Sequence, residues 1–192
     1  MIANILSSIN FIDILMGLIL IRCMYMGSTA GLVVEFFKLV GMLFATFITL
    51  HYFIAMGEFL NRVIFIPLDL TEMISFLLLW MLVVLVFKVV RDGWMLLIKT
   101  EAQEAFNKIG GAVAGIFRGA LVCGLTTLVF FLSGNHYLIK SVNTSFSGFY
   151  LTHFSTSVYE SSFDGLISKF FPKEKKNLDA LRITGKGQKK KE

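Results

Sequence analysis

The sequence predicts an all-α integral membrane protein with about four transmembrane helices and additional short amphipathic helices. Of its 192 residues, 56% are hydrophobic and only 16% are charged, and the mean hydropathy is +0.74. A soluble domain is usually about 25% charged. The four apolar stretches are continuous and do not alternate with period two, which excludes a transmembrane β-barrel. The composition also excludes a disordered chain, a collagen-like chain and a disulfide-bonded scaffold.

The four predicted spans come close to the length of about 20 residues that a helix needs to cross a bilayer core of about 30 Å. The first span holds Asp13 and Arg22, and the second begins with Glu35 and Lys38. The third is uncharged in its middle part, and the fourth is interrupted by Arg118. The predicted spans are residues 11–26, 32–56, 70–90 and 109–133.

Shorter pieces lie between and after the spans. Residues 57–67, which end at Pro67, suit either a re-entrant or an interfacial helix. Residues 92–108 carry Trp94 beside a charged face, as expected of a helix in the headgroup layer. We predict a four-span domain over residues 10–140, a Ser/Thr-rich and amphipathic extramembrane segment over residues 141–171, and a basic, disordered tail over residues 172–192.

The net charge of +5 lies entirely in the predicted tail. Residues 1–171 hold ten Lys or Arg and ten Asp or Glu, whereas residues 172–192 hold eight and three. The tail has no aromatic side chain on which a base could stack, so we do not expect nucleic-acid binding. We expect its partner to be anionic lipid or an anionic envelope polymer.

The cations near the span ends predict the orientation, because cytoplasmic loops carry an excess of Lys and Arg. The connection between the second and third spans has one cation, Arg62, whereas the other two connections together have five. This excess places the first and third connections in the cytoplasm, so we expect both termini outside it. Lys140 and the tail oppose this assignment, but the tail begins beyond the range of about 15–20 residues over which the rule acts. The five cations of the first and third connections are Arg22, Lys88, Arg91, Lys99 and Lys108.

The most specific local pattern is Gly111-x-x-x-Gly115-x-x-x-Gly119, a glycine zipper along one narrow stripe of the fourth span. Missing side chains allow a neighbouring helix to approach closely, and such packing replaces the hydrophobic drive inside lipid. Gly41 and Ala45 begin a second stripe of small residues, on the second span. The two stripes could pack against each other. Helix packing within a chain or between protomers is the simpler explanation, and a glycine-lined pore or gate is the alternative.

Ionisable residues at membrane depth are costly and are therefore candidate functional residues. If the turn after the first span is centred near Ser28, Arg22 and Glu35 lie at mirror positions of an antiparallel hairpin and are predicted to pair. Glu35 and Lys38 are also neighbours at i and i+3, with the acid first. Asp13 is nine residues from Arg22 and lies on the opposite helix face, so these two cannot pair within the helix.

Arg118 allows two interpretations. Counted from Ile109, it lies about 13 Å into the fourth span at 1.5 Å per residue. Residues 119–139 are themselves an uncharged run, however, so Arg118 could instead be an anchor at the membrane interface. In either case it is a candidate intramembrane polar residue.

No motif supports catalysis, a metal site or a cofactor. His51, His136 and His153 are not at the spacing of a zinc site, and no G-x-S-x-G elbow or phosphate-binding loop occurs. Cys23 and Cys123 lie inside apolar spans, where we expect them to be small packing residues. The sequence therefore predicts no catalytic, cofactor-binding or metal-binding residue, and no enzyme.

Three groups of residues carry a family resemblance: Asn10 and Asp13, then Gly31 and Glu35, then Gly111, Gly115, Arg118 and Gly119. Over roughly residues 10–150 the chain resembles the colicin V production protein family of bacterial inner-membrane proteins, and the third group is the most specific match. The chain departs from the family at Ala30, where the family often has arginine, and at Asn107, where it has aspartate. We therefore transfer no charge pair to those two positions.

The resemblance implies a four-span protein of the bacterial inner membrane that supports production or export of a toxin peptide and envelope homeostasis. Family members in which this domain precedes a periplasmic serine protease imply an external C-terminus, in agreement with the loop charges. We expect action through contacts with other membrane proteins or with a second copy of the chain. The alternative is a small oligomeric channel or transporter built on the glycine stripes. An interfacial hydrolase is a third class, and the sequence lacks a nucleophile–base motif for it.

Overall fold

The computed structural model describes residues 10–64, 68–97, 104–170 and 176–182, and all secondary structure in these ranges is helical. Within these ranges, four helices are long and apolar enough to cross a membrane, which confirms the predicted fold class. They are α2 (Phe11–Ala30), α3 (Leu32–Ile64), α4 (Leu68–Leu97) and α5 (Glu104–Leu132). The shorter elements are α6 (His136–Thr144), α7 (Phe146–Ser162), the π-helical turn η1 (Phe163–Ile167), α8 (Ser168–Phe170) and α9 (Leu178–Arg182).

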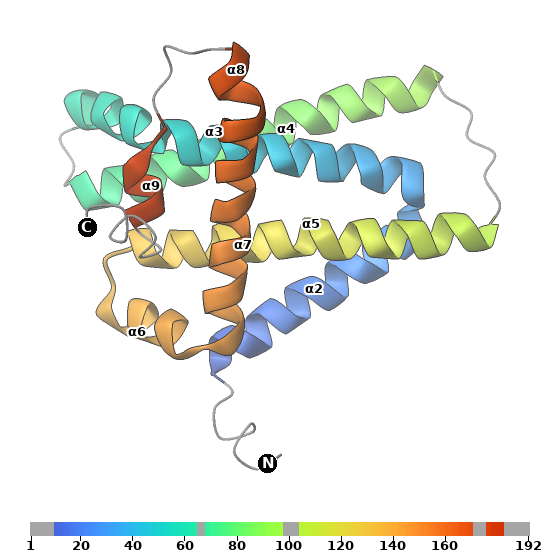
Figure 1. Cartoon of the computed structure of the whole chain (residues 1–192), viewed down its shortest axis with the longest axis horizontal. Helices are drawn as coiled ribbons and strands as arrows, with labels where there is room; N and C mark the ends of the chain where they lie inside the picture. Colours follow the sequence, from blue (N-terminus) through green and yellow to red (C-terminus); the bar gives the residue numbers. More distant parts are fainter. Residues whose placement is uncertain (1–9, 65–67, 98–103, 171–175, 183–192) are drawn as a thin grey trace.

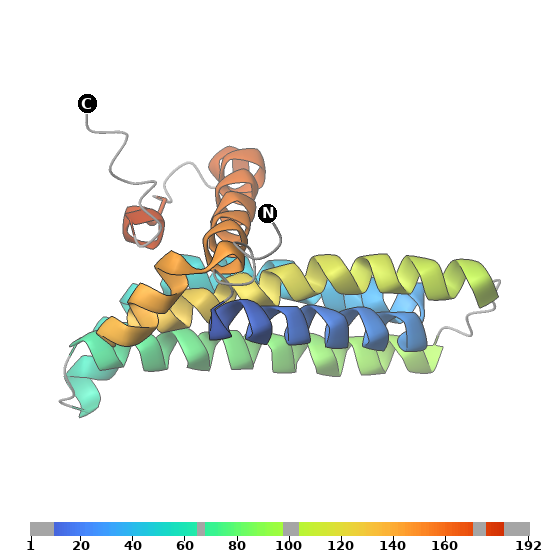
Figure 2. The ribbon, with the colours of Figure 1, turned by 90° about the horizontal axis from the view of Figure 1, so that it is seen from below.

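The four long helices run roughly along one axis, and α7 crosses them (Figure 1). α3 and α4 form an antiparallel hairpin, whereas α2 packs mainly along α5, which lies far later in the sequence. α5 also packs against α3 and so joins α2 to the α3–α4 hairpin. Figure 2 shows that α7 lies on one side of the long helices.

The long helices differ in how far they extend. α2 has 20 residues and spans about 30 Å, the thickness of the hydrocarbon core. α3 has 33 residues and α4 has 30, so they reach about 50 Å and 45 Å and project beyond the start of α2 (Figures 1 and 2). Residues 57–64 continue α3 and residues 92–97 continue α4, so neither forms a separate re-entrant or interfacial helix. Gly57 lies against Glu72 of α4, because the packing of the hairpin continues past its uncharged part.

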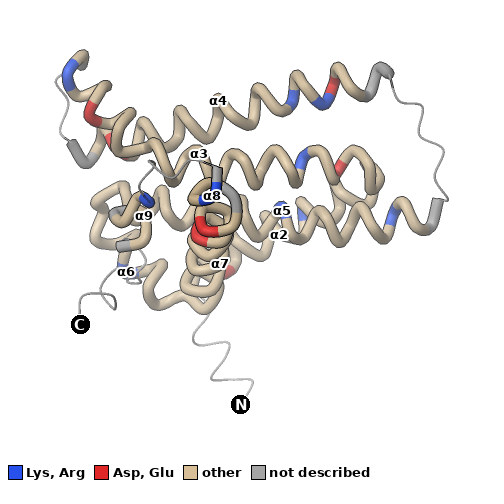
Figure 3. Tube along the Cα trace, turned by 45° about the horizontal axis from the view of Figure 1, so that its top comes forward, with Lys and Arg blue, Asp and Glu red and all other residues tan. Residues whose placement is uncertain are grey.

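The middle parts of α3 and α4 carry no charged side chain (Figure 3). This uncharged band covers residues 39–57 of α3 and residues 73–87 of α4. Charged side chains in these helices lie before and after the band; water or lipid headgroups can solvate exposed ones such as Arg62 and Lys88, whereas Glu35 is buried within the protein. The protein is therefore suited to a lipid bilayer.

The helix α7 turns small polar side chains inward along its length and exposes three aromatic side chains in its first half, whereas Tyr159 near its end is fully buried. Gly124 of α5 allows the close crossing, because a Cβ at that position would overlap the hydroxyl oxygen of Ser155. The hydroxyls of Thr127 and Thr152 share a hydrogen bond of 2.6 Å across the same contact. Small residues at a helix crossing allow the two backbones to approach closely. The exposed aromatic residues are Phe146, Phe149 and Tyr150.

Part of the predicted disordered tail is folded. α9 places Ala180 and Leu181 in the main hydrophobic core. The side-chain amide of Asn177 donates to the carbonyl oxygen of Leu50 at 2.9 Å, and its backbone N–H donates to the hydroxyl of Tyr159 at 3.0 Å. The prediction of disorder is therefore wrong for residues 176–182, because these apolar and amide groups find partners despite the basic surroundings. Residues 172–175 and 183–192 of the predicted tail lie outside the described residues.

Candidate functional site

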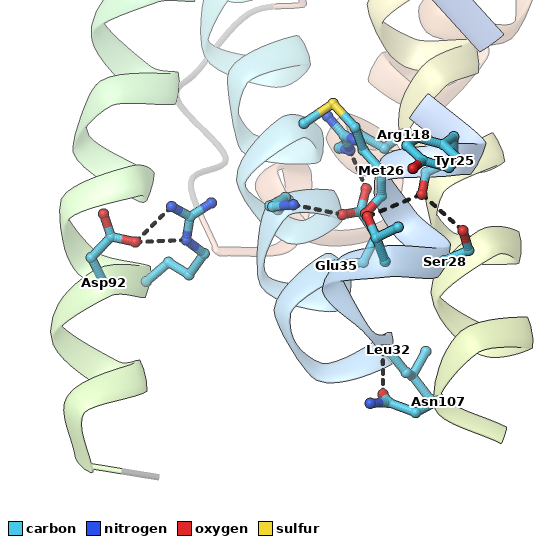
Figure 4. Close-up of polar contacts among 11 residues, drawn as sticks. Tyr25, Met26, Ser28, Leu32, Glu35, Asp92, Asn107 and Arg118 are labelled. Carbon is cyan, nitrogen blue, oxygen red and sulfur yellow. Dashed lines mark hydrogen bonds and ion pairs between the residues drawn. The ribbon is translucent and has the colours of Figure 1, made fainter. Parts of the chain in front are cut away.

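Glu35, in the first turn of α3, is fully buried at the centre of a charge cluster. Its Oε2 accepts a hydrogen bond from Nζ of Lys38 at 2.9 Å, and its Oε1 accepts one from Nε of Arg118 on α5 (Figure 4). The side chains of Lys38 and Arg118 are 18% and 16% exposed. A charge removed from water must be paired, and here one carboxylate has two cationic partners. The cluster joins α3 to α5 and keeps one excess positive charge.

The structure shows which residue Arg118 contacts. Its guanidinium is largely buried and paired with Glu35 of α3, so it is held within the protein. The predicted i,i+3 contact between Glu35 and Lys38 is confirmed.

The reversal between α2 and α3 positions Glu35. Gly31 is the single residue between the two helices, and its φ of +84° lies in a region that L side chains rarely adopt. Asn107 of α5 accepts a 2.6 Å hydrogen bond from the N–H of Leu32 and so caps α3 from another helix (Figure 4). A Cβ at Gly31 would lie 2.6 Å from the amide nitrogen of Asn107.

Gly31→Ala is expected to lower the free energy of unfolding by about 1–3 kcal/mol, because alanine is strained at this φ and its Cβ displaces Asn107. The measurement is the midpoint of thermal unfolding in detergent. Gly17→Ala is the matched control, since a Cβ at Gly17 meets no atom within 4 Å. Equal midpoints for the two variants would contradict the role of Gly31.

The three glycines predicted on the fourth span lie against α2. A Cβ at Gly111 would overlap the carbonyl oxygen of Gly27, and a Cβ at Gly115 would lie 2.5 Å from the carbonyl oxygen of Cys23. A Cβ at Gly119 would lie 3.0 Å from the Cβ of Cys23. The sequence prediction does not include Gly27, although α2 shows the same four-residue spacing as α5 in Cys23, Gly27 and Gly31.

The second small stripe does not face the first. A Cβ at Gly41 would lie 2.8 Å from the Cβ of Phe87, so Gly41 marks the close approach of α3 to α4. Ala45 is fully buried in the main hydrophobic core. The glycine stripe of α5 is already occupied by α2, so α3 contacts α5 through other residues.

The predicted pair between Arg22 and Glu35 is wrong. Arg22 is exposed, and Glu35 is paired with the two cations of the cluster. The reason is the position of the turn, which is centred at Gly31 and not near Ser28. The mirror position of Glu35 across this turn is therefore Gly27.

Asp13 lies at the other end of α2 and is separate from the cluster of Glu35. Its Oδ1 accepts hydrogen bonds from the backbone N–H and the hydroxyl of Ser147, at 2.8 and 2.5 Å. Asn10 caps α2 and donates from its side-chain amide to the carbonyl oxygen of Ser141 at 2.8 Å. These contacts fasten the start of α2 to α6 and α7.

Among the described residues, no three His, Cys, Asp or Glu side chains come together as a metal-binding group. Cys23 and Cys123 are free and buried. The ring of His51 instead contacts the hydroxyl of Tyr159 at 3.0 Å, within the group that also holds Asn177. The chemistry of the described site is thus that of paired charges between close-packed helices.

A comparison with known protein families gives a match over most of the chain. The model of the colicin V production protein family matches residues 12–167. The chain belongs to the colicin V production protein family. No curated protein and no solved structure gives a significant match. The matched residues contain the charge cluster and both sides of the α2–α5 contact, so this is a membrane protein of a family associated with colicin production.

Ala30 and Asn107, the two positions to which we transferred no charge pair, lie at one junction. Ala30 directly precedes Gly31 at the end of α2, and Asn107 contacts the next residue of the reversal. An aspartate at position 107 would also present an oxygen to the N–H of Leu32. Asn107 therefore supplies this acceptor without a negative charge.

Proposed function

We propose that this member of the colicin V production protein family is a non-enzymatic scaffold of the bacterial inner membrane. It supports production or export of a toxin peptide and envelope homeostasis through contacts with other membrane proteins. Family membership supports the link to toxin production, and the internal pairing of the buried charge cluster is the observation that carries the scaffold role.

Internal pairing favours a scaffold over a channel or transporter. An ion pathway needs polar or titratable groups that face a water-filled axis. Glu35 is instead fully buried, and both of its carboxylate oxygens accept hydrogen bonds. A glycine-lined pore would need the glycine stripe of α5, which α2 covers within one chain.

A flux measurement tests the scaffold against the channel. The purified full-length protein, reconstituted in liposomes, is expected to release K⁺ or a small dye no faster than protein-free liposomes do. A pore-forming protein reconstituted in parallel shows that the assay detects flux. Release above the protein-free rate would overturn the scaffold and support the channel.

A secretion assay tests the cellular role. Deleting the gene from a bacterium that secretes a colicin V-type peptide is expected to reduce the secreted peptide and to increase sensitivity to detergent. Expression of the wild-type chain is expected to restore both. Unchanged secretion in the deletion strain would contradict the proposal.

Single cysteines at the two ends of the bundle test the orientation. In a background that lacks Cys23 and Cys123, Thr29→Cys is expected to be protected from an impermeant maleimide added to spheroplasts. Asn143→Cys is expected to react, because α6 lies at the outer end in our assignment. Neither position is buried within the protein, so other side chains of the chain do not shield the introduced thiol. The reverse labelling pattern would place the α2–α3 reversal outside.

A further inference from the structure

A groove of about 840 Å³ lies between the long helices and is lined mostly by apolar side chains. α4 provides most of the lining, α3 and α5 contribute Met42 and Val122, and α2 contributes Met26. On α4 the lining residues Met81 and Val84 are 70% and 43% exposed. The groove is therefore open along its side, toward the lipid that surrounds the bundle.

One end of this groove is cationic. Its cationic lining residues are Lys38, Lys88, Arg91 and Arg118. Two of them share the carboxylate of Glu35, and Arg91 donates to Oδ1 of Asp92 at 2.9 Å from Nε and 2.6 Å from Nη2. Four cations against two carboxylates leave the end of the groove with a net charge of +2.

Part of this positive charge has no acceptor in the described structure. Lys88 is exposed and forms no ion pair with any described residue. Nη2 of Arg118 is buried without a hydrogen-bond partner among the described residues. The end of the groove therefore has spare capacity to bind an anion.

The groove has the dimensions of one leaflet. From Ile74 to Lys88, both of which line it, α4 rises about 21 Å, and one leaflet with its headgroup layer is about 20–22 Å thick. Trp94 lies one turn beyond Arg91 and stacks on Phe37 with ring centroids 6.5 Å apart. Tryptophan is enriched at the level of the lipid headgroups, so the cationic end lies at headgroup depth.

We propose that this groove is a binding site for an anionic phospholipid. An acyl chain lies along the apolar wall of α4, and the phosphate of the headgroup binds Lys88 and Arg91. Charge complementarity selects the anionic lipid, because the ammonium group of a zwitterionic headgroup would meet the same excess of positive charge. The open side of the groove explains how a lipid enters directly from the bilayer.

Native mass spectrometry of the full-length protein in detergent, titrated with phosphatidylglycerol or with phosphatidylcholine of the same acyl chains, tests the proposal. Phosphatidylglycerol is expected to bind at least about five-fold more tightly. Lys88→Gln with Arg91→Gln is expected to weaken phosphatidylglycerol binding by about 10- to 30-fold and to remove the preference. Lys140→Gln with Lys169→Gln, a pair of exposed cations outside the groove, is the control with the same change of charge.

A second pair of variants tests the groove without changing charge. Val84→Trp fills the groove and is expected to weaken both lipids at least five-fold, whereas Val86→Trp on the same helix lies outside the lining and is expected to change neither. Equal binding of the two lipids by the wild type would overturn the proposal. Equal effects of the two double charge variants, or of the two tryptophan variants, would also overturn it. A dimer that the wild type forms and Val84→Trp does not would show that a second copy of the chain, and not a lipid, occupies the groove.

Discussion

Gly115→Leu is expected to separate α2 from α5 and to lower the free energy of unfolding by about 3 kcal/mol or more. The first added atom, Cβ, would lie 2.5 Å from the carbonyl oxygen of Cys23 and 3.3 Å from the Cα of Gly27. Both are backbone atoms, so no change of rotamer relieves the overlap. The separation would also pull Arg118, three residues later, away from Glu35.

The midpoint of thermal unfolding in detergent and the amount of folded protein in membranes measure this effect. Gly17→Leu is the matched control on α2, because its Cβ meets no atom within 4 Å. Gly115→Ala is expected to fall between Gly115→Leu and the wild type. A midpoint for Gly115→Leu equal to that of Gly17→Leu would show that the α2–α5 contact is not formed as described.

Glu35→Gln is expected to lower the free energy of unfolding by about 3 kcal/mol, because it leaves two largely buried cations without a carboxylate. Glutamine has nearly the same volume, so the loss reports on charge and not on a cavity. Arg118→Gln is expected to cost less, since Lys38 still neutralises Glu35. The measurement is unfolding in detergent at neutral pH.

The double variant separates pairing from independent effects. Glu35→Gln with Arg118→Gln is expected to cost clearly less than the sum of the two single changes, because the partners are in contact. Arg22→Gln is the control for the rejected pair and is expected to change stability by no more than about 0.5 kcal/mol. Additive losses for Glu35 and Arg118, or coupling between Glu35 and Arg22, would contradict the cluster.

The four spans could be predicted because the length of an uncharged apolar run reports directly on the thickness that a helix must cross. The contact between Glu35 and Lys38 could be predicted for a similar reason, since helical spacing alone brings them together. Both features depend on residues that are close in the sequence. The glycine stripe of α5 was likewise visible as a spacing.

The partners of these local features could not be predicted from spacing. Whether Glu35 faces Arg22 or Arg118 depends on where the helix reversal lies, and a shift of three residues to Gly31 changes the partner. That reversal is fixed by Asn107, which lies 75 residues away from Leu32 in the chain. α9 was missed for the same reason, because the groups that bury Ala180 and Leu181 belong to helices distant in sequence.

The ion pair between Glu35 and Arg118 can form only late in the synthesis of the chain. The two residues are 83 positions apart, and at about 5–20 residues per second the ribosome needs about 4–17 s to make that interval. During this time the rest of α3 and all of α4 are synthesised, whereas α5, the helix against which α2 packs, is still incomplete. Of the two cations that will hold the carboxylate, only Lys38 already exists. Until Arg118 is synthesised, the carboxylate of Glu35 therefore has only one of its two cationic partners, and the α2–α5 contact cannot form before α5 is complete.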